Sequence, residues 1–306
     1  MKIANAQQVR LAEHSFAGLT RGAGYALIVL LGAVAAFLFA QSLPALTATG
    51  ENASILDTNF WAYVGPLLFG TVWVSILALA LALPVAVGIA LFTTHYAPRR
   101  IAGLLGSLVD LLAAVPSVVF GLWGIWVLAP ALQPLYTWLA DYLGWIPLFA
   151  GPVSATGRTI LTAAIVLAVM ILPIITSLSR EVFLQTPRLT EEAALALGAT
   201  RWEMIRLSVI PFGRSGVLSA AVLGLGRALG ETMAVTMVLS ATGAVSFRLL
   251  TSQNPSTIAA NLALTFPEAY QTNINVLIAT GLLLFIVTFL VSALSRRIVR
   301  KLSASE

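Results

Sequence analysis

Residues 191–211 read EEAALALGATRWEMIRLSVIP, a polar stretch in a chain that is otherwise largely apolar. The pattern predicts two short helices that are separated at Gly198. Thr190 can cap the first helix, and the acidic Glu191 and Glu192 in its first turn are stabilised by the positive end of the helix dipole. Gly198 can adopt the left-handed conformation that commonly ends a helix.

The second predicted helix opens at Thr200, because Glu203 follows at the three-residue spacing of a capping box. Pro211 is expected just after the end of this helix. A simple loop between two membrane helices needs neither capped helices nor a cluster of bases, so these features favour a segment that docks on a partner. The bases in and beside it are Arg188, Arg201, Arg206 and Arg214.

The composition indicates an integral membrane protein. Of the 306 residues 59% are hydrophobic and 9% are charged, whereas charged residues make up about a quarter of an average soluble domain. There are no cysteines, which excludes disulfides and thiolate chemistry, and two histidines are too few for a histidine-rich metal cluster. No nucleophilic triad, zinc-ligand spacing or phosphate-binding P-loop occurs, and the bases form no nucleic-acid patch. We therefore predict no catalytic residue, metal, cofactor or nucleic-acid partner.

Six apolar runs are long enough to cross a bilayer, for which about 20 residues suffice. They are residues 23–43, 66–92, 103–128, 158–179, 215–240 and 274–295. Pro84 and Pro116 are expected to kink the second and third runs. The mixed segment 129–157 is typical of a re-entrant or interfacial piece. The chain thus divides into an N-terminal segment, a membrane domain and a basic tail, at residues 1–22, 23–295 and 296–306.

The distribution of basic residues predicts the orientation. Six spans put both termini and residues 188–211 on one side, and fourteen of the 17 lysines and arginines fall in segments on that side. By the positive-inside rule this side is the cytoplasm. The basic tail can also contact anionic membrane lipid, although topology alone explains its charge.

Residues 188–211 resemble the E-A-A-x(3)-G-x(9)-I-x-L-P loop of ABC-importer permeases. The matching positions are Glu192, Ala193, Ala194, Gly198 and Pro211, whereas Ser208 and Ile210 replace the Ile and Leu of the pattern. In that family the loop is a coupling helix that sits in a groove of a cytoplasmic ATPase, so the resemblance implies the same role for the coupling segment (residues 188–211). Ser208 would place a small polar group at an apolar docking position.

Two charges lie inside the fifth predicted span. Arg227 is about eleven residues into it, roughly 17 Å deep, and Glu231 follows four residues later on the same predicted face. A charge at that depth costs at least about 2.5–3.5 kcal/mol unless it faces a partner or a watery path.

Two interpretations of this pair remain open. It can be a structural ion pair, beside which Gly226 and Gly230 at GxxxG spacing favour close helix packing. Alternatively, Arg227 lines a translocation path, because a planar guanidinium suits a tetrahedral oxyanion. Glu231 would then hold Arg227 and could select protonated phosphate over sulfate by accepting a hydrogen bond.

A narrower resemblance covers most of residues 66–295. The runs GRALGETMAV (residues 226–235) and VPSVVFGLWGIWVLAP (residues 115–130) are similar to those of the C-type permease subunit of phosphate-specific ABC importers. The resemblance implies an A-type permease partner, a cytoplasmic ABC ATPase dimer and an extracytoplasmic phosphate-binding protein, in a bacterial cytoplasmic membrane. It also implies that Arg227 and Glu231 are the charged pair used in transport.

Three further polar residues are weaker candidates for the path. Asp110 is more typical of a hydrogen-bonding residue at a helix end, and Ser117 and Thr232 could line a polar route. The sequence thus predicts an all-α, six-span permease of the type I ABC-importer kind, which moves phosphate and leaves ATP hydrolysis to a partner. The alternatives are another oxyanion, such as molybdate or sulfate, or an ion-driven carrier, for which a coupling segment has no use and inverted repeats would be expected.

Overall fold

The computed structural model describes residues 6–48, 53–56 and 59–303, and every extended regular element in these ranges is a helix. Six of the helical segments are long and apolar enough to cross a membrane, which confirms the predicted number of spans. They are Phe16–Leu46, Phe60–Tyr96, Ser117–Leu143, Ile160–Leu184, Arg201–Leu229 and Thr272–Val299.

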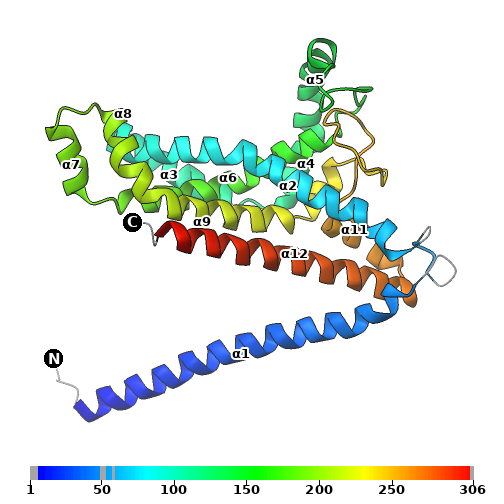
Figure 1. Ribbon diagram of the computed structural model, residues 1–306, viewed down its shortest axis with the longest axis horizontal. Helices are drawn as coiled ribbons and strands as arrows, with labels where there is room; N and C mark the ends of the chain where they lie inside the picture. The colour runs from blue at the N-terminus through cyan, green and yellow to red at the C-terminus, as the bar shows by residue number, and fades with distance from the viewer. Residues whose placement is uncertain (1–5, 49–52, 57–58, 304–306) are drawn as a thin grey trace.

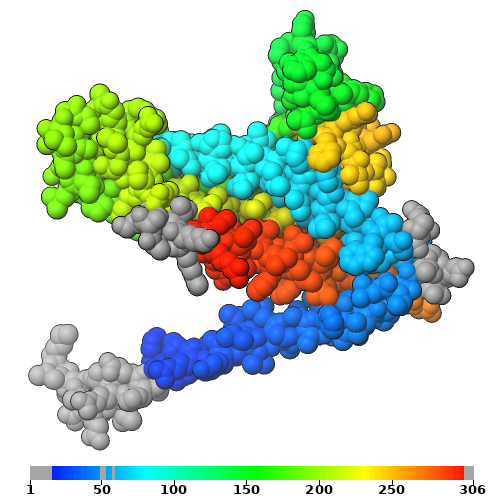
Figure 2. Space-filling view, viewed as in Figure 1, coloured from blue at the N-terminus to red at the C-terminus, as the bar shows by residue number. Residues whose placement is uncertain are grey.

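The long helices form a layered bundle around α6 (Ile160–Leu184), which packs against α2 (Phe60–Leu91) and α9 (Ile210–Leu229). α12 (Thr272–Ser303) lies on the other side of α9 (Figure 1). α1 (Ala6–Leu46) contacts α12 near one end and then diverges from the body (Figure 2). In their most apolar stretches 67% of the α6 residues are buried but none of the α1 residues, so α6 is the centre of this chain.

The prediction that the third span is a single helix with a kink at Pro116 is wrong. α3 (Arg99–Ala113) ends before Pro116, which is extended and caps a new helix, α4 (Ser117–Trp123). This helix continues through the π-helical turn η2 (Gly124–Leu128) into α5 (Ala129–Leu143), so half of the segment 129–157 is helical. Proline disfavours helical geometry in the residue before it and has no N–H, which explains a break rather than a bend. Pro84, by contrast, lies within an uninterrupted α2.

The fifth predicted span, 215–240, is also interrupted. α9 ends at Leu229, and Gly230 follows with a non-helical conformation. A separate short helix, α10 (Met233–Val238), comes after it. The chain then forms an irregular segment, α11 (Ile258–Thr265) and the 3-10 turn η4 (Phe266–Glu268) before α12.

Glycines let α9 approach α6 closely, but they are not the predicted ones. A Cβ at Gly213 would lie 2.6 Å from the Phe183 ring, and one at Gly224 would lie 2.8 Å from Ile175. A Cβ at Gly226 would meet nothing within 4 Å. The predicted close packing at the 226/230 spacing is therefore not made by the described residues, which leave that face of α9 open.

The coupling segment forms a block at one end of the bundle. It contains α7 (Arg188–Ala196), α8 (Arg201–Met204) and the π-helical turn η3 (Ile205–Val209), which leads directly into α9. The block protrudes beyond the long helices, at the end where α12 finishes (Figures 1 and 2). The π-helical turn η1 (Phe92–Tyr96), which finishes the second span, packs nearby against α3 and α6.

Candidate functional site

The end of α7 has the predicted geometry, whereas its start does not. Gly198 has φ +87°, and the N–H of Ala199 donates to the carbonyl of Ala194 at 3.2 Å, which closes the helix. At the start, Pro187 occupies the cap position and the Thr190 hydroxyl donates back to the Pro187 carbonyl at 2.7 Å. The expectation that Thr190 caps α7 is therefore wrong, because the proline begins the helix earlier.

The second half of the coupling segment opens with the predicted capping box. The N–H of Thr200 donates to Glu203 Oε2 at 2.8 Å, and the N–H of Glu203 donates to Thr200 Oγ1 at 3.3 Å. Pro211 does not follow a helix end, as expected, but lies in the first turn of α9. A proline is tolerated there because its missing N–H is not needed at the start of that helix. The π-helical turn η3, which precedes Pro211, continues the helical backbone from α8 into α9.

The outer face of the coupling segment is a hydrophobic groove. The groove has a volume of about 790 Å³ and includes three of the five motif residues, Ala193, Ala194 and Gly198. Leu197 is 91% exposed and Leu207 67% exposed beside it. Glu192 and Pro211 are also exposed, although they do not line the groove. Large exposed aliphatic side chains on a polar, capped segment are typical of a docking surface.

The inner face of the same segment is attached to the bundle at two points and is braced internally at a third. Ala194 packs on a small core of Ala90, Phe183, Met204, Ile205 and Val209. His95 Nε2 of η1 lies 3.5 Å from Glu191 Oε1 of α7, in an ion-pair contact with both side chains largely buried. Ser208 Oγ donates to the Thr190 carbonyl at 3.2 Å. Ser208 therefore joins η3 to α7, and its hydroxyl is engaged within the chain rather than with a partner.

Arg227 lies in the last turn of α9, exposed on the open face beside Gly226. It lines a groove of about 540 Å³ between α9 and α12, together with Ser219 and Ser292. Arg296 lines the same groove, although the sequence indicated only a topological role for it. The sequence positions of residues 227 and 296 do not predict that they line one groove. Antiparallel packing of α9 and α12 places them there (Figure 1).

Glu231 is not one turn beyond Arg227 on a continuous helix. It lies in the break after Gly230, where its Oε1 accepts a hydrogen bond from the N–H of Ala234 at 3.2 Å, at the start of α10. Among the residues that the structure describes, Arg227 and Glu231 form no ion pair. The predicted pairing fails because the backbone leaves the helix between the two side chains.

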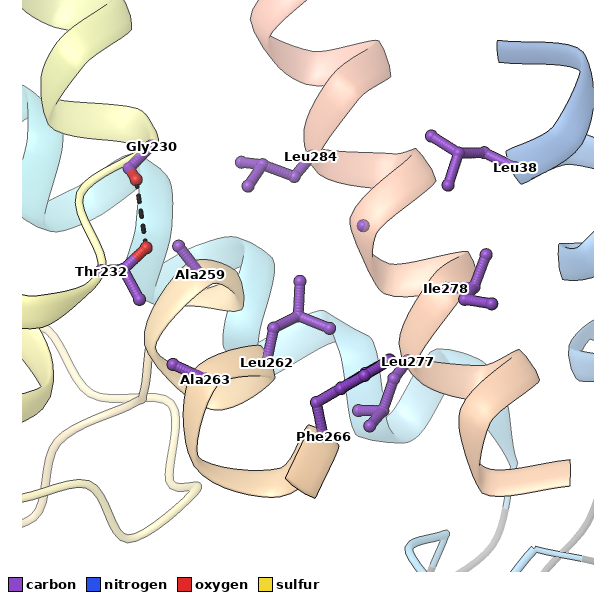
Figure 3. A pocket seen from close by; sticks show the side chains of 11 residues that line it. Leu38, Gly230, Thr232, Ala259, Leu262, Ala263, Phe266, Leu277, Ile278 and Leu284 are labelled. Atoms are coloured by element: carbon purple, nitrogen blue, oxygen red, sulfur yellow. Dashed lines mark hydrogen bonds between the residues drawn. The ribbon is translucent and has the colours of Figure 1, made fainter. Parts of the chain in front are cut away.

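Thr232 faces a different cavity from Arg227. Its Oγ1 donates to the Gly230 carbonyl at 3.3 Å, and both residues line a largely apolar pocket of about 550 Å³ between α11 and α12 (Figure 3). Ala259 and Ala263 lie beside Thr232, whereas Leu262, Leu284 and Phe266 line the pocket further towards α12 (Figure 3). Ser117 begins α4, which packs on α10 through Gly121, and is half-buried. The structure thus does not gather Ser117 and Thr232 around Arg227.

Asp110 lies near the end of α3 and shares no described cavity with the break in the fifth span. It borders a very small polar cavity, of about 10 Å³, with Thr93, Thr176 and Arg180. The Arg180 guanidinium covers Gly106, where a Cβ would come within 2.6 Å of Nη1. The surroundings of Asp110 fit the polar helix-contact interpretation, and they separate it from the Arg227 groove.

Arg158 and Asn254 organise the irregular outer segment, and the sequence did not single them out. Arg158 Nη2 donates to the Met237 carbonyl at 3.1 Å and thereby holds the end of α10. Asn254 is fully buried, accepts from the N–H of Ile160 and donates to the Ser240 and Thr251 carbonyls. A lone Asn in a polar loop carries no sequence signal of such a role.

Comparison with known proteins places these features in a family. The model of the "Binding-protein-dependent transport system inner membrane component" family matches residues 82–304. A "Phosphate transport system permease protein PstC 2" of Mycobacterium tuberculosis is 49% identical over 300 residues, covering 94% of this chain and 92% of the relative. A "Phosphate transport system permease protein PstC" of Mesorhizobium japonicum is 40% identical and covers 98% and 94%, respectively.

A solved structure supports the fold independently. An inward-facing structure of the MetNI methionine ABC transporter matches with a TM-score of 0.57 at 16% identity, covering 79% of this chain and 96% of that one. The arrangement of helices is thus that of a type I ABC-importer permease. The chain belongs to the family of binding-protein-dependent transport system inner membrane components, among its PstC-like permeases.

Proposed function

We propose that this chain is a membrane-spanning subunit of an ATP-driven importer of inorganic phosphate. The observation that carries the proposal is the combination of an exposed coupling segment with Arg227, which has no ion-pair partner among the described residues and lies on an open face of α9. The names of relatives at 40–50% identity support phosphate as the cargo. Molybdate or sulfate remains the alternative cargo within the same class.

In this proposal the coupling segment binds one subunit of a cytoplasmic ABC ATPase dimer. Leu197 and Leu207 would insert into the ATPase, while Glu192, Ala193, Ala194, Gly198 and Pro211 shape the segment that carries them. ATP hydrolysis belongs to that partner, and this chain is not itself an enzyme. The coupling segment, both termini and the tail 296–306 would lie in the cytoplasm.

The open face of α9 would meet an A-type permease subunit and form the translocation path with it. Arg227 would contact the anion, and an extracytoplasmic phosphate-binding protein would deliver it to the outer segments. Glu231 would border the path at the α9–α10 break, with Asp110, Ser117 and Thr232 as secondary candidates. A guanidinium offers parallel donors to two oxygens of a tetrahedral anion, which favours Arg227 as the first contact.

The test is ATP-driven uptake of labelled phosphate by the reconstituted complex, with wild type compared with Arg227→Gln. We expect ATP-dependent uptake that excess sulfate and molybdate do not suppress, and a loss of at least about tenfold in the variant. Copurification of all subunits is the control for assembly. Full competition by sulfate or molybdate would reject phosphate as the cargo, and unchanged uptake in the variant would make Arg227 structural.

A further inference from the structure

Two guanidinium groups line one groove of this chain. Arg227 comes from α9 and Arg296 from α12, and the hydroxyls of Ser219 and Ser292 lie on the same walls. The remaining lining is Ile174, Val222, Leu223 and Gly226. Ser219 Oγ donates to the Ser215 carbonyl at 2.9 Å, which leaves the two guanidinium groups and the Ser292 hydroxyl as the donors of the groove. A groove with an aliphatic base and these donors is suited to an anion rather than to an apolar ligand.

Neither guanidinium is neutralised within the described part of the chain. The ion-pair contact found there joins His95 to Glu191, and neither residue lines this groove. Arg296 Nε donates to the Ser292 carbonyl at 3.2 Å, and no protein acceptor meets its Nη nitrogens in the described ranges. Arg227 makes no side-chain hydrogen bond to the described residues. Two unpaired cations on one membrane-facing groove require an anionic counterpart.

The depth of the groove favours the transported anion over a lipid headgroup. Arg227 lies seventeen residues after the start of α9, about 25 Å along the helix. A lipid headgroup at the level of the coupling segment, where α9 starts, would therefore not reach Arg227. A small oxyanion that moves along the groove can contact first one guanidinium and then the other.

We propose that Arg296 is a second contact for the translocated oxyanion and forms a two-arginine site with Arg227. Arg296 lies towards the end of α12 that adjoins the coupling segment (Figure 1). The anion would pass from Arg227 to Arg296 and leave on the side of the coupling segment. This inference rests on the proposed transport function and assigns a binding role to a residue that positive-inside topology would otherwise explain.

The experiment compares Arg296→Gln with Arg297→Gln in the reconstituted complex. Arg297 is the adjacent exposed residue of α12 and does not line the groove, so it controls for loss of one tail charge. We expect phosphate uptake at limiting phosphate to fall about tenfold in Arg296→Gln and less than about twofold in Arg297→Gln. Equal losses in the two variants would overturn the inference.

Because the chain has no cysteines, charge rescue gives a second readout. Arg296→Cys is treated either with a cationic aminoethyl thiosulfonate or with the neutral methyl reagent, in complexes whose other subunits carry no reactive cysteine. Recovery of uptake with the cationic reagent only is the expected result. Equal effects of both reagents would show that bulk rather than charge matters and would reject the site.

Two further comparisons test whether Arg296 binds a lipid headgroup or a partner subunit instead of the transported anion. The Arg296→Gln defect should persist in vesicles of uncharged galactolipid, which contain no phosphate. If it disappears there, or if the variant copurifies with less partner subunit, Arg296 binds a headgroup or a partner carboxylate and the inference fails. A wild type without ATP-driven phosphate uptake would overturn the transport function itself, whereas an active wild type with unchanged Arg296→Gln would overturn this inference alone.

Discussion

At the scale of the residue, Glu231 shows how one backbone break changes the role of a side chain. On a continuous helix it would lie one turn from Arg227 and pair with it. After the break, one carboxylate oxygen accepts from the N–H of Ala234 and fixes the start of α10. The other oxygen has no protein partner in the described part of the chain, and under the proposed transport function it would accept from a protonated anion.

Glu231→Gln separates these two roles. Glutamine keeps an oxygen that can accept from Ala234, so assembly and phosphate uptake should be largely retained. If the carboxylate repels fully ionised anions, sulfate should compete with phosphate several-fold better in the variant. The measurement is inhibition of labelled phosphate uptake by sulfate. An unchanged inhibition curve would leave Glu231 with its capping role only.

Ser208 also has a role in the structure that its place in the family pattern did not predict. Its departure from the family pattern suggested a defect in a docking surface, but its hydroxyl donates to the Thr190 carbonyl and ties two parts of the coupling segment together. A hydroxyl in place of an aliphatic side chain exchanges an apolar contact for one hydrogen bond, worth about 0.5–1.5 kcal/mol. The departure therefore has a structural use inside this chain.

At the scale of the element, the coupling segment is attached to the end of the second span through His95 and Glu191. Thr94 Oγ1 lies 2.6 Å from His95 Nδ1, which orients the ring so that Nε2 faces the carboxylate. The contact joins η1 to α7, so movement of a docked ATPase would be passed to α2 as well as to α9. This polar contact adds to the apolar core that already packs Ala194 of α7 with Ala90 of α2.

We expect His95→Ala to lower the amount of phosphate taken up per ATP hydrolysed, several-fold, because α7 then loses its polar contact with the end of the second span and is held there by apolar packing alone. The measurement is uptake and ATP hydrolysis in the same vesicles. Glu181→Gln is the control, because this exposed acid lies near the same end of the bundle and has no ion pair in the described ranges. The exchanged pair His95→Glu with Glu191→His should restore the ratio. A proportional loss of both activities would indicate a purely structural contact.

At the scale of the whole molecule, the start of the described α1 and the end of α12 lie at the same end as the coupling segment (Figure 1). This agrees with the expectation that an even number of spans brings both termini to one side. α1 exposes nearly all of its apolar surface along most of its length. Lipid or another subunit must cover that surface in the assembled transporter.

The orientation is tested by single cysteines in this cysteine-free chain. An impermeant thiol reagent added outside intact cells should label Ala244→Cys in the irregular segment after α10. It should label Ala196→Cys in the coupling segment only after permeabilisation. Both positions are exposed, so accessibility within the protein is matched. The reverse pattern would invert the proposed topology.

Much of the architecture could be predicted because membrane insertion imposes simple rules on sequence. Long apolar runs predicted the number of spans, and capping chemistry predicted the Thr200–Glu203 box and the left-handed Gly198. The two span errors, at Pro116 and Gly230, have one cause. Hydropathy reports that a segment prefers the membrane, but it does not report whether the backbone continues as one helix through it.

The sequence by itself determined the fold class, the number of spans and the coupling segment, because burial in lipid and helix capping act on residues that are close along the chain. Tertiary structure alone decided which polar groups meet. It brought His95 to Glu191, placed Arg227 and Arg296 on one groove, and separated Arg227 from Glu231. Such contacts depend on how helices pack and where their backbones break, and neither is encoded in the spacing of the residues involved.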